Sequence, residues 1–320
     1  MPATIVLVCF GLSPIATALL PPPAPDGAYP GGNTAEGAGA LHDVNTAVGV
    51  NNTAVGFNAL TSDTTGQYNV AVGSGALASN TTGNFNMAIG AEALKNNNSN
   101  FNLAIGFRVG FMNTTGRHLT GIGAAALRNN TIGSFNTAIG ADAMRENTAG
   151  EQNTAIGSGA LSSNTTGGQN TANGAFALLS NSTGFDNTAV GTLALNQNTA
   201  GSENNASGAS ALSQHTTGDS NNAVGANALL VDQSGFANNG FGNDALAGNL
   251  TGNSNTAIGD GALLGWHGSA NTAIGAGAGA NVDTAHNVIC IGSPGANVSD
   301  SFYVAKYLRP QLMPTTCQCT

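Results

Sequence analysis

Hydrophobic and polar positions along this chain follow a period of 17 residues. Each repeat resembles NTAIGSGALSSNTTGGQ, which occupies residues 153–169 and begins again at Asn170. The glycine that ends each N-T-A-[VI]-G recurs from Gly56 to Gly292, and twelve of its fourteen intervals are 17 residues long, while two are 16. A second glycine, from N-T-T-G, usually follows ten residues later, so each repeat is expected to contain two turns. A looser first copy starts the array near Asn33.

This pattern predicts an all-β protein, a parallel β-solenoid of about fifteen 17-residue coils. Glycine at fixed positions disfavours helix, and the Thr, Val and Ile between the glycines favour short strands. We expect two strands of about five residues in each coil, with a rise of about 4.8 Å from one coil to the next. The array would then form a rod roughly 70 Å long.

The residue types at equal positions of successive repeats predict ladders of stacked side chains. Val or Ile precedes the first glycine and Leu follows it by four residues, and we expect both to line the interior. Ala three residues after the glycine indicates a close backbone approach, and Asn four residues before it indicates a hydrogen-bonded amide ladder. Because one coil buries little apolar surface, we expect several rods to associate side by side.

Outside the repeats, three further segments are predicted. Residues 1–20 are interpreted as a secretory signal peptide, because an apolar stretch ends near Ala16-Thr17-Ala18, although the missing positive start leaves a membrane anchor or a misassigned start as alternatives. Residues 21–32 form a Pro/Gly-rich spacer, residues 33–299 the repeat domain, and residues 300–320 an aperiodic tail. Cys290 occupies a position that is otherwise Ala or Gly, and we expect it to be a small buried residue.

Charge and motifs argue against several functions. With 7 basic and 16 acidic residues the net charge is −9, which gives no electrostatic footprint for nucleic acid. Neither a G-x-S-x-G elbow nor a phosphate-binding loop is present, and the five histidines lie at unrelated repeat positions. We therefore expect a non-enzymatic protein with no cofactor, no metal and no small-molecule substrate.

One local feature exceeds the repeat pattern. Five residues before the first glycine, five successive coils carry rings, and this set is called the ring stripe below. The favoured interpretation is a stack of rings that only shields the backbone, and a contact strip for a partner surface or a glycan is the functional alternative. The ring stripe consists of Tyr68, Phe85, Phe101, His118 and Phe135.

The repeats carry a family resemblance. N-T-A-[VI]-G followed by x-x-A-L resembles the head repeats of YadA-like trimeric autotransporter adhesins over roughly Asn33 to Gly292. The resemblance implies a left-handed parallel β-roll of three chains, exposed on a bacterial surface and used to hold host or matrix surfaces. The 17-residue pattern also resembles repeat regions of secreted bacterial proteins and phage-tail-like fibres. The coil is longer than that of the adhesin heads, and nothing after Gly292 fits their heptad stalk or membrane anchor, or the fibres' chaperone domain.

These observations predict an extracellular adhesive rod, secreted or on the bacterial cell surface, that mediates cell adhesion as a homotrimer. An ice-binding solenoid and the shaft of a phage-tail-like fibre are the alternatives. Ice binding would use ranks of Thr such as Thr137, Thr154, Thr171 and Thr188. We expect this Thr to face inward with the Ile/Val ladder, and Val70, Met87 and Leu103 replace it in three coils, so the adhesive rod is favoured.

Overall fold

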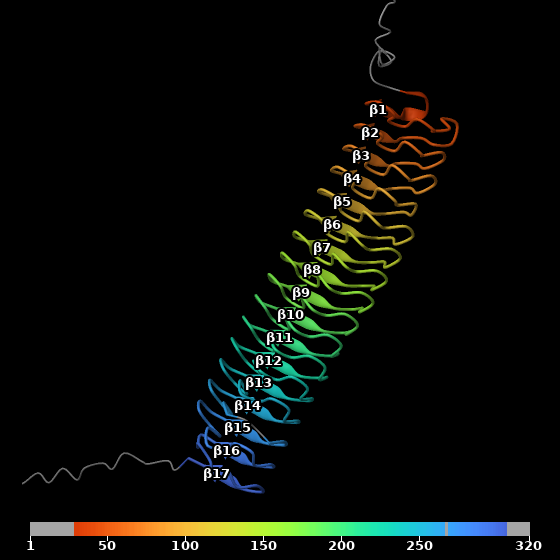
Figure 1. Ribbon diagram of the computed structural model, residues 1–320. Coiled ribbons are helices and arrows are strands. Elements are labelled where there is room, and N and C mark those ends of the chain that lie inside the picture. Colours follow the sequence, from red (N-terminus) through yellow and green to blue (C-terminus); the bar gives the residue numbers. More distant parts are fainter. Residues whose placement is uncertain (1–28, 266–267, 306–320) are drawn as a thin grey trace, which may run out of the picture.

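The computed structural model describes residues 29–265 and 268–305 as one β-solenoid (Figure 1). A single parallel sheet of seventeen strands runs along one side of the rod, and the chain enters and leaves at opposite ends. The all-β parallel solenoid predicted from the repeats is therefore confirmed. A short 3₁₀ turn, η1, covers Pro30–Gly32. The strands are β1 (Thr34–Glu36), β2 (Thr53–Val55), β3 (Val70–Val72), β4 (Met87–Ile89), β5 (Leu103–Ile105), β6 (Thr120–Ile122), β7 (Thr137–Ile139), β8 (Thr154–Ile156), β9 (Thr171–Asn173), β10 (Thr188–Val190), β11 (Asn205–Ser207), β12 (Asn222–Val224), β13 (Asn239–Phe241), β14 (Thr256–Ile258), β15 (Thr272–Ile274), β16 (Ile289–Ile291) and β17 (Phe302–Val304).

Successive strands pair so that equal repeat positions stand side by side. In the pairing of β7 with β8, Thr137 lies opposite Thr154 and Ile139 opposite Ile156. The first pairing, β1 with β2, starts the array where the looser first copy predicts it. The last, β16 with β17, carries the sheet a few residues past the predicted boundary at residue 299.

Each described coil holds one strand of three residues, and the prediction of two strands of about five residues is wrong. After the strand, the chain folds through tight turns: Ala160 N–H donates to Gly157 O at 3.3 Å, and Leu161 has a φ of 51°. Turn residues still reach the neighbouring coil, as Leu161 N–H donates to Ala177 O at 3.0 Å. Backbone N–H and C=O groups of the turns thus find hydrogen-bond partners in neighbouring coils without a second regular strand.

The direction of the strand side chains also differs from the prediction. Ala155 is buried, whereas Ile156 is 39% exposed and Thr154 is half-buried. Because successive side chains of a strand point to opposite faces, the buried Asn153 fixes Ala155 inward and turns Thr154 and Ile156 outward. The expectation that Thr and Ile/Val line the interior is therefore wrong. Leu from the opposite turn fills the core and leaves room only for Ala on the sheet side.

The two repeat positions require glycine for different structural reasons. Gly157 has a φ of 131°, and a Cβ added there would lie 2.6 Å from the Gly174 carbonyl oxygen of the next coil. Gly150, from the second glycine column, lacks a positive φ, but a Cβ there would collide with the Gly167 carbonyl oxygen. The first position therefore requires glycine for both backbone angle and space, and the second for space alone.

Two columns of buried amides run through the interior. The predicted ladder is confirmed: Asn170 N–H donates to Asn153 Oδ1 at 2.9 Å, and Asn170 Nδ2 donates to Gly184 O at 2.9 Å. A second ladder, from the Asn of N-T-T-G, was not predicted; in it Asn164 Nδ2 donates to Asn147 Oδ1 at 2.7 Å. We call this second set the turn amide column. It begins with Asp63 and continues through Asn80, Asn97, Asn113, Asn130, Asn147, Asn164, Asn181, Asn198, His215, Asp232 and Asn249.

Two smaller expectations concern the ends of the chain. Cys290 is buried opposite Ala273, as predicted, and its burial raises the pKa of the thiol. Among the described residues, no helix is long and apolar enough to cross a membrane. The predicted signal peptide and most of the predicted spacer and tail lie outside the described residues.

Candidate interaction surface

The structure brings the ring stripe together as one stack. Ring centroids of successive members lie 4.9 to 5.2 Å apart, and neighbouring planes differ by at most 10°. Tyr68, Phe85, Phe101 and Phe135 are each 48–50% exposed. The spacing matches the coil rise of about 4.8 Å, because each ring comes from the same position of the next coil.

The stack presents ring edges to solvent. Each inner ring lies face to face with two neighbouring rings, whereas Tyr68 and Phe135, at the two ends, each stack on one ring only. All five residues are in the left-handed region, with φ between 56° and 61°. This conformation is costly for bulky side chains and suits Asn or Gly better, so stacking offsets a local backbone cost here.

An apolar hollow separates the ring stripe from the sheet. It has a volume of about 500 Å³ and is lined by Phe85, Met87, Phe101, Leu103 and His118, among others. Met87 itself is 40% exposed. Met87 of β4 and Leu103 of β5, which stand where most other strands carry Thr, contribute part of its apolar lining.

The outward face of the sheet is a repetitive surface that runs the length of the solenoid. It consists of two columns, one mostly Thr (Thr154 and its equivalents) and one mostly Ile or Val (Ile156 and its equivalents), which we call the Thr column and the Ile/Val column. From β2 to β16 neither column contains a charged residue. Such a long, uncharged and partly apolar strip is typical of surfaces that contact another molecule.

The basic residues of the described chain gather in the same half of the rod as the ring stripe, between Lys95 and Arg145. Most are compensated: Glu92 accepts from Lys95 at 2.9 Å and from Arg108 at 2.6 Å, which lowers the pKa of Glu92. The Arg108 guanidinium also lies 5.0 Å from the centre of the Phe107 ring. Lys95 and Arg108 share the one carboxylate of Glu92, so this pairing leaves one positive charge uncompensated.

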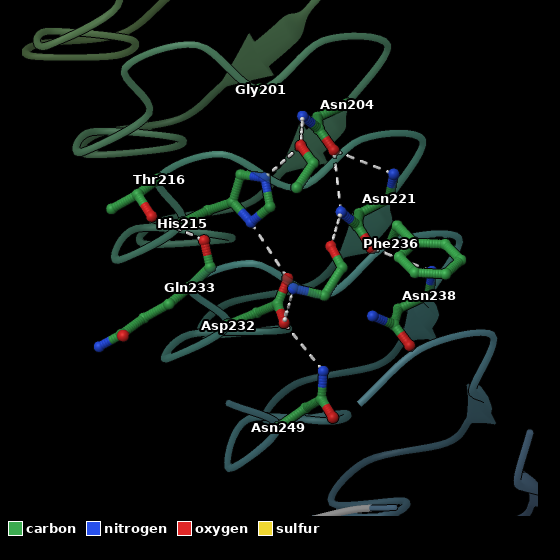
Figure 2. A network of polar contacts seen from close by, with 12 residues as sticks. Gly201, Asn204, His215, Thr216, Asn221, Asp232, Gln233, Phe236, Asn238 and Asn249 are labelled. Carbon is green, nitrogen blue, oxygen red and sulfur yellow. Dashed lines mark hydrogen bonds and ion pairs between the residues drawn. The ribbon is translucent and has the colours of Figure 1, made fainter. Parts of the chain in front are cut away.

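A buried His–Asp pair interrupts the turn amide column (Figure 2). His215 Nε2 lies 2.7 Å from Gly218 O, and Nδ1 lies 3.0 Å from Asp232 Oδ2. A carbonyl only accepts, so Nε2 carries a proton, and Nδ1 and the carboxylate share one more. Asp232 also accepts from Asn249 Nδ2 at 2.9 Å, while burial raises the pKa of Asp232.

The sequence signal for this pair is its spacing. His215 and Asp232 are 17 residues apart, so the repeat rule places them in adjacent coils, yet the search for converging histidines missed them. Both side chains are fully buried, and the pair is closed to an external substrate. Within the described ranges, no group of three or more His, Cys, Asp or Glu side chains is placed to hold a metal ion.

Comparison with known proteins finds no relative of this chain. No protein-family model, curated protein or solved structure matches this chain. The chain is accordingly placed by its own geometry, as a β-solenoid repeat protein.

Proposed function

We propose that this chain is a non-enzymatic structural rod that works as the adhesive repeat head of an extracellular or bacterial surface protein. The carrying observation is the uncharged outward sheet face, which presents its Thr and Ile/Val columns to solvent from β2 to β16. A face of this length and composition suits burial against other copies of the chain, in line with the trimer that the resemblance to YadA-like heads implies.

The dimensions of this face fit a stable association. Three residues of strand span about 10 Å and fifteen coils span about 70 Å, which gives roughly 700 Å² per chain. This approaches the roughly 800 Å² per partner that specific interfaces bury. In the assembled rod the ring stripe, at a corner of the coil, is the proposed contact for a host, matrix or glycan surface.

Light scattering coupled to size exclusion of the full chain tests the assembly. A mass of about three times the 31.5 kDa chain, on an elongated particle, is the expected result. A folded monomer at all concentrations would overturn the homotrimer and with it the adhesin-head proposal.

Ice binding is the second candidate, because one observation now favours it. Five successive strands, β6 to β10, turn Thr outward on the sheet face, contrary to the inward direction expected from the sequence. Inhibition of ice recrystallisation by the monomeric chain, lost when Thr154 and Thr171 are changed to Lys, would support this candidate. Absence of any effect on ice at high protein concentration would remove it.

A further inference from the structure

A periodic rod has a register problem when copies associate. Sliding one chain along another by one coil, about 4.8 Å, brings almost the same side chains into contact again. The repeated Thr and Ile/Val columns therefore cannot by themselves choose one axial alignment, as with slippage in repetitive strands. Only departures from the repeat on the contacting face can distinguish one alignment from the next.

The Thr column contains two runs of such departures, besides the single Ile289 in β16, and the Ile/Val column departs singly at Asn173, Ser207 and Phe241. In β3 to β5 the Thr column becomes apolar, with Val70, Met87 and Leu103. In β11 to β13 it becomes a run of amides, Asn205, Asn222 and Asn239, in which Asn222 Nδ2 donates to Asn239 Oδ1 at 2.9 Å. These two runs lie far apart along the rod (Figure 1).

We infer that Val70, Met87 and Leu103 form a register key that aligns parallel copies of this chain at equal height. The inference rests on the proposed self-association. In a parallel assembly without stagger, the apolar run of each chain meets the same run of its partners, and amides meet amides. Any slip places an apolar side chain against Thr, or separates the amides from their counterparts.

The same pattern disfavours antiparallel copies. With full overlap, an antiparallel partner would bring Asn239, Thr256 and Thr272 opposite the apolar run of β3 to β5. Apolar groups would then be buried against polar groups that lack hydrogen-bond partners in that position. The adjoining hollow, lined by Met87 and Leu103 together with rings of the ring stripe, extends the apolar run of β4 and β5 sideways.

Cross-linking between marked chains measures the register. In the full chain with its native cysteines changed to Ala, one copy carries Thr154→Cys and a differently tagged copy carries Thr154→Cys, Thr171→Cys, Thr188→Cys or Thr256→Cys. These pairs report offsets of zero, one, two and six coils along the Thr column. After co-expression and oxidation, the disulfide yield is expected to fall at least tenfold from zero to six coils.

The decisive variant restores the repeat: Val70→Thr, Met87→Thr and Leu103→Thr together. The expected result is a folded oligomer in which the fall in yield from zero to six coils shrinks to about threefold or less, because only the amide run of β11 to β13 and single departures such as Phe241 still distinguish one alignment from another. The matched control, Ile258→Val with Ile274→Val and Ile291→Val, changes three residues of the same face to a type found at Val55 and Val72, and is expected to keep the steep profile.

The outcomes separate the two proposals. A monomeric parent chain overturns both the self-association and the register key, and leaves the face to a different partner. An oligomer whose parent profile is already flat, or whose triple Thr variant stays steep, overturns the register key and leaves the self-association standing. Circular dichroism of each variant confirms that the solenoid is retained.

Discussion

At the scale of the residue, this fold depends on small side chains and satisfied amides. Ala155 and its equivalents are buried because the wall formed by Leu161 leaves no room for more, and each buried Asn has carbonyl oxygens at hand to accept from it. The interior therefore contains far more amide than an ordinary hydrophobic core. Residues other than Asn in these columns are therefore expected to change the free energy of unfolding strongly.

Asp63 is the first exception in the turn amide column. It is fully buried and accepts from Asn80 Nδ2 at 2.9 Å and from Asn52 Nδ2 at 3.3 Å, without a positively charged partner. Burial is the main cause that raises the pKa of Asp63 from 3.8 to about 6. The folded protein therefore holds this proton at a pH where the unfolded chain has released it.

The raised pKa of Asp63 determines how stability changes with pH. Below about pH 4 the carboxyl is protonated in both states, and between about pH 4 and 6 the free energy of unfolding falls as pH rises. For Asp63→Asn we expect this loss to disappear. Between pH 4 and pH 7 the free energy of unfolding of the variant, relative to that of the parent, should therefore rise by on the order of 2 kcal/mol. Urea unfolding of both proteins at both pH values measures this difference. Asp142→Asn, at a half-exposed carboxylate, is the control, and an equal change in both variants would contradict the assignment.

The His215–Asp232 pair is the second exception and predicts a strong coupling. His215→Asn sets an amide oxygen against the buried Asp232 carboxyl, so this change alone should lower the free energy of unfolding by about 3 kcal/mol. In Asp232→Asn the new Nδ2 can donate to His215 Nδ1, so we expect a smaller loss. The double change restores an unbroken run of Asn and gives Asn198 Oδ1, which has no donor, a donor again.

We therefore expect the double variant to lie within about 1 kcal/mol of the parent, or above it. Denaturant unfolding of the four proteins at pH 7 gives the coupling energy. Additive losses, with the double variant the least stable, would show that the pair does not act as a unit.

At the scale of the element, each coil combines one short strand with a run of turns. The turns carry the left-handed residues, and one of these positions holds the ring stripe in five coils and polar residues in the next ones. Gln152 and Gln169 adopt the same φ of 59° at that position as Phe135. The backbone of the coil therefore does not depend on a ring there.

This equivalence allows a test of the ring stripe that keeps the fold. For Phe85→Gln, Phe101→Gln and Phe135→Gln together we expect retained solenoid structure and an at least tenfold loss of binding to matrix-coated and glycan-coated surfaces. The control changes Phe185 and Phe236 to Ser, in a column that also holds Ser134 and Ser202. Unchanged binding of the triple variant would assign the rings to shielding the backbone corner alone.

At the scale of the whole molecule, the rod is nearly one-dimensional, because each described strand pairs only with those directly before and after it. Stability should therefore be close to a sum over coils and their interfaces. Copy number then sets length with little effect on the fold.

Removing two whole coils tests this. Deleting residues 154–187 joins Asn153 to Thr188 and keeps the repeat in phase, so we expect a folded rod shortened by about 10 Å in small-angle scattering. Deleting residues 154–162 instead joins Asn153 to Ser163 and breaks the phase. If the out-of-phase deletion folds as well as the in-phase one, stacking of equal positions is not what stabilises the rod.

The sequence by itself determined the stacking. A 17-residue period means that equal positions are neighbours, which is why the parallel register, the stacked rings and the Asn153 ladder all follow from counting. The same count would have paired His215 with Asp232. What counting does not give is direction, because the period is the same whichever side of the strand faces inward.

The tertiary structure decided that direction. Thr154 and Ile156 point outward, against expectation from their hydrophobicity, because the turn carrying Leu161 fills the interior and the amide of Asn153 finds its acceptor, Gly167 O at 2.9 Å, only on the inner side. The same turn replaced the second strand that was expected. Inside and outside are set by the opposite wall of the coil, which is a matter of volume and hydrogen-bond partners across the core and is not contained in the period of the sequence.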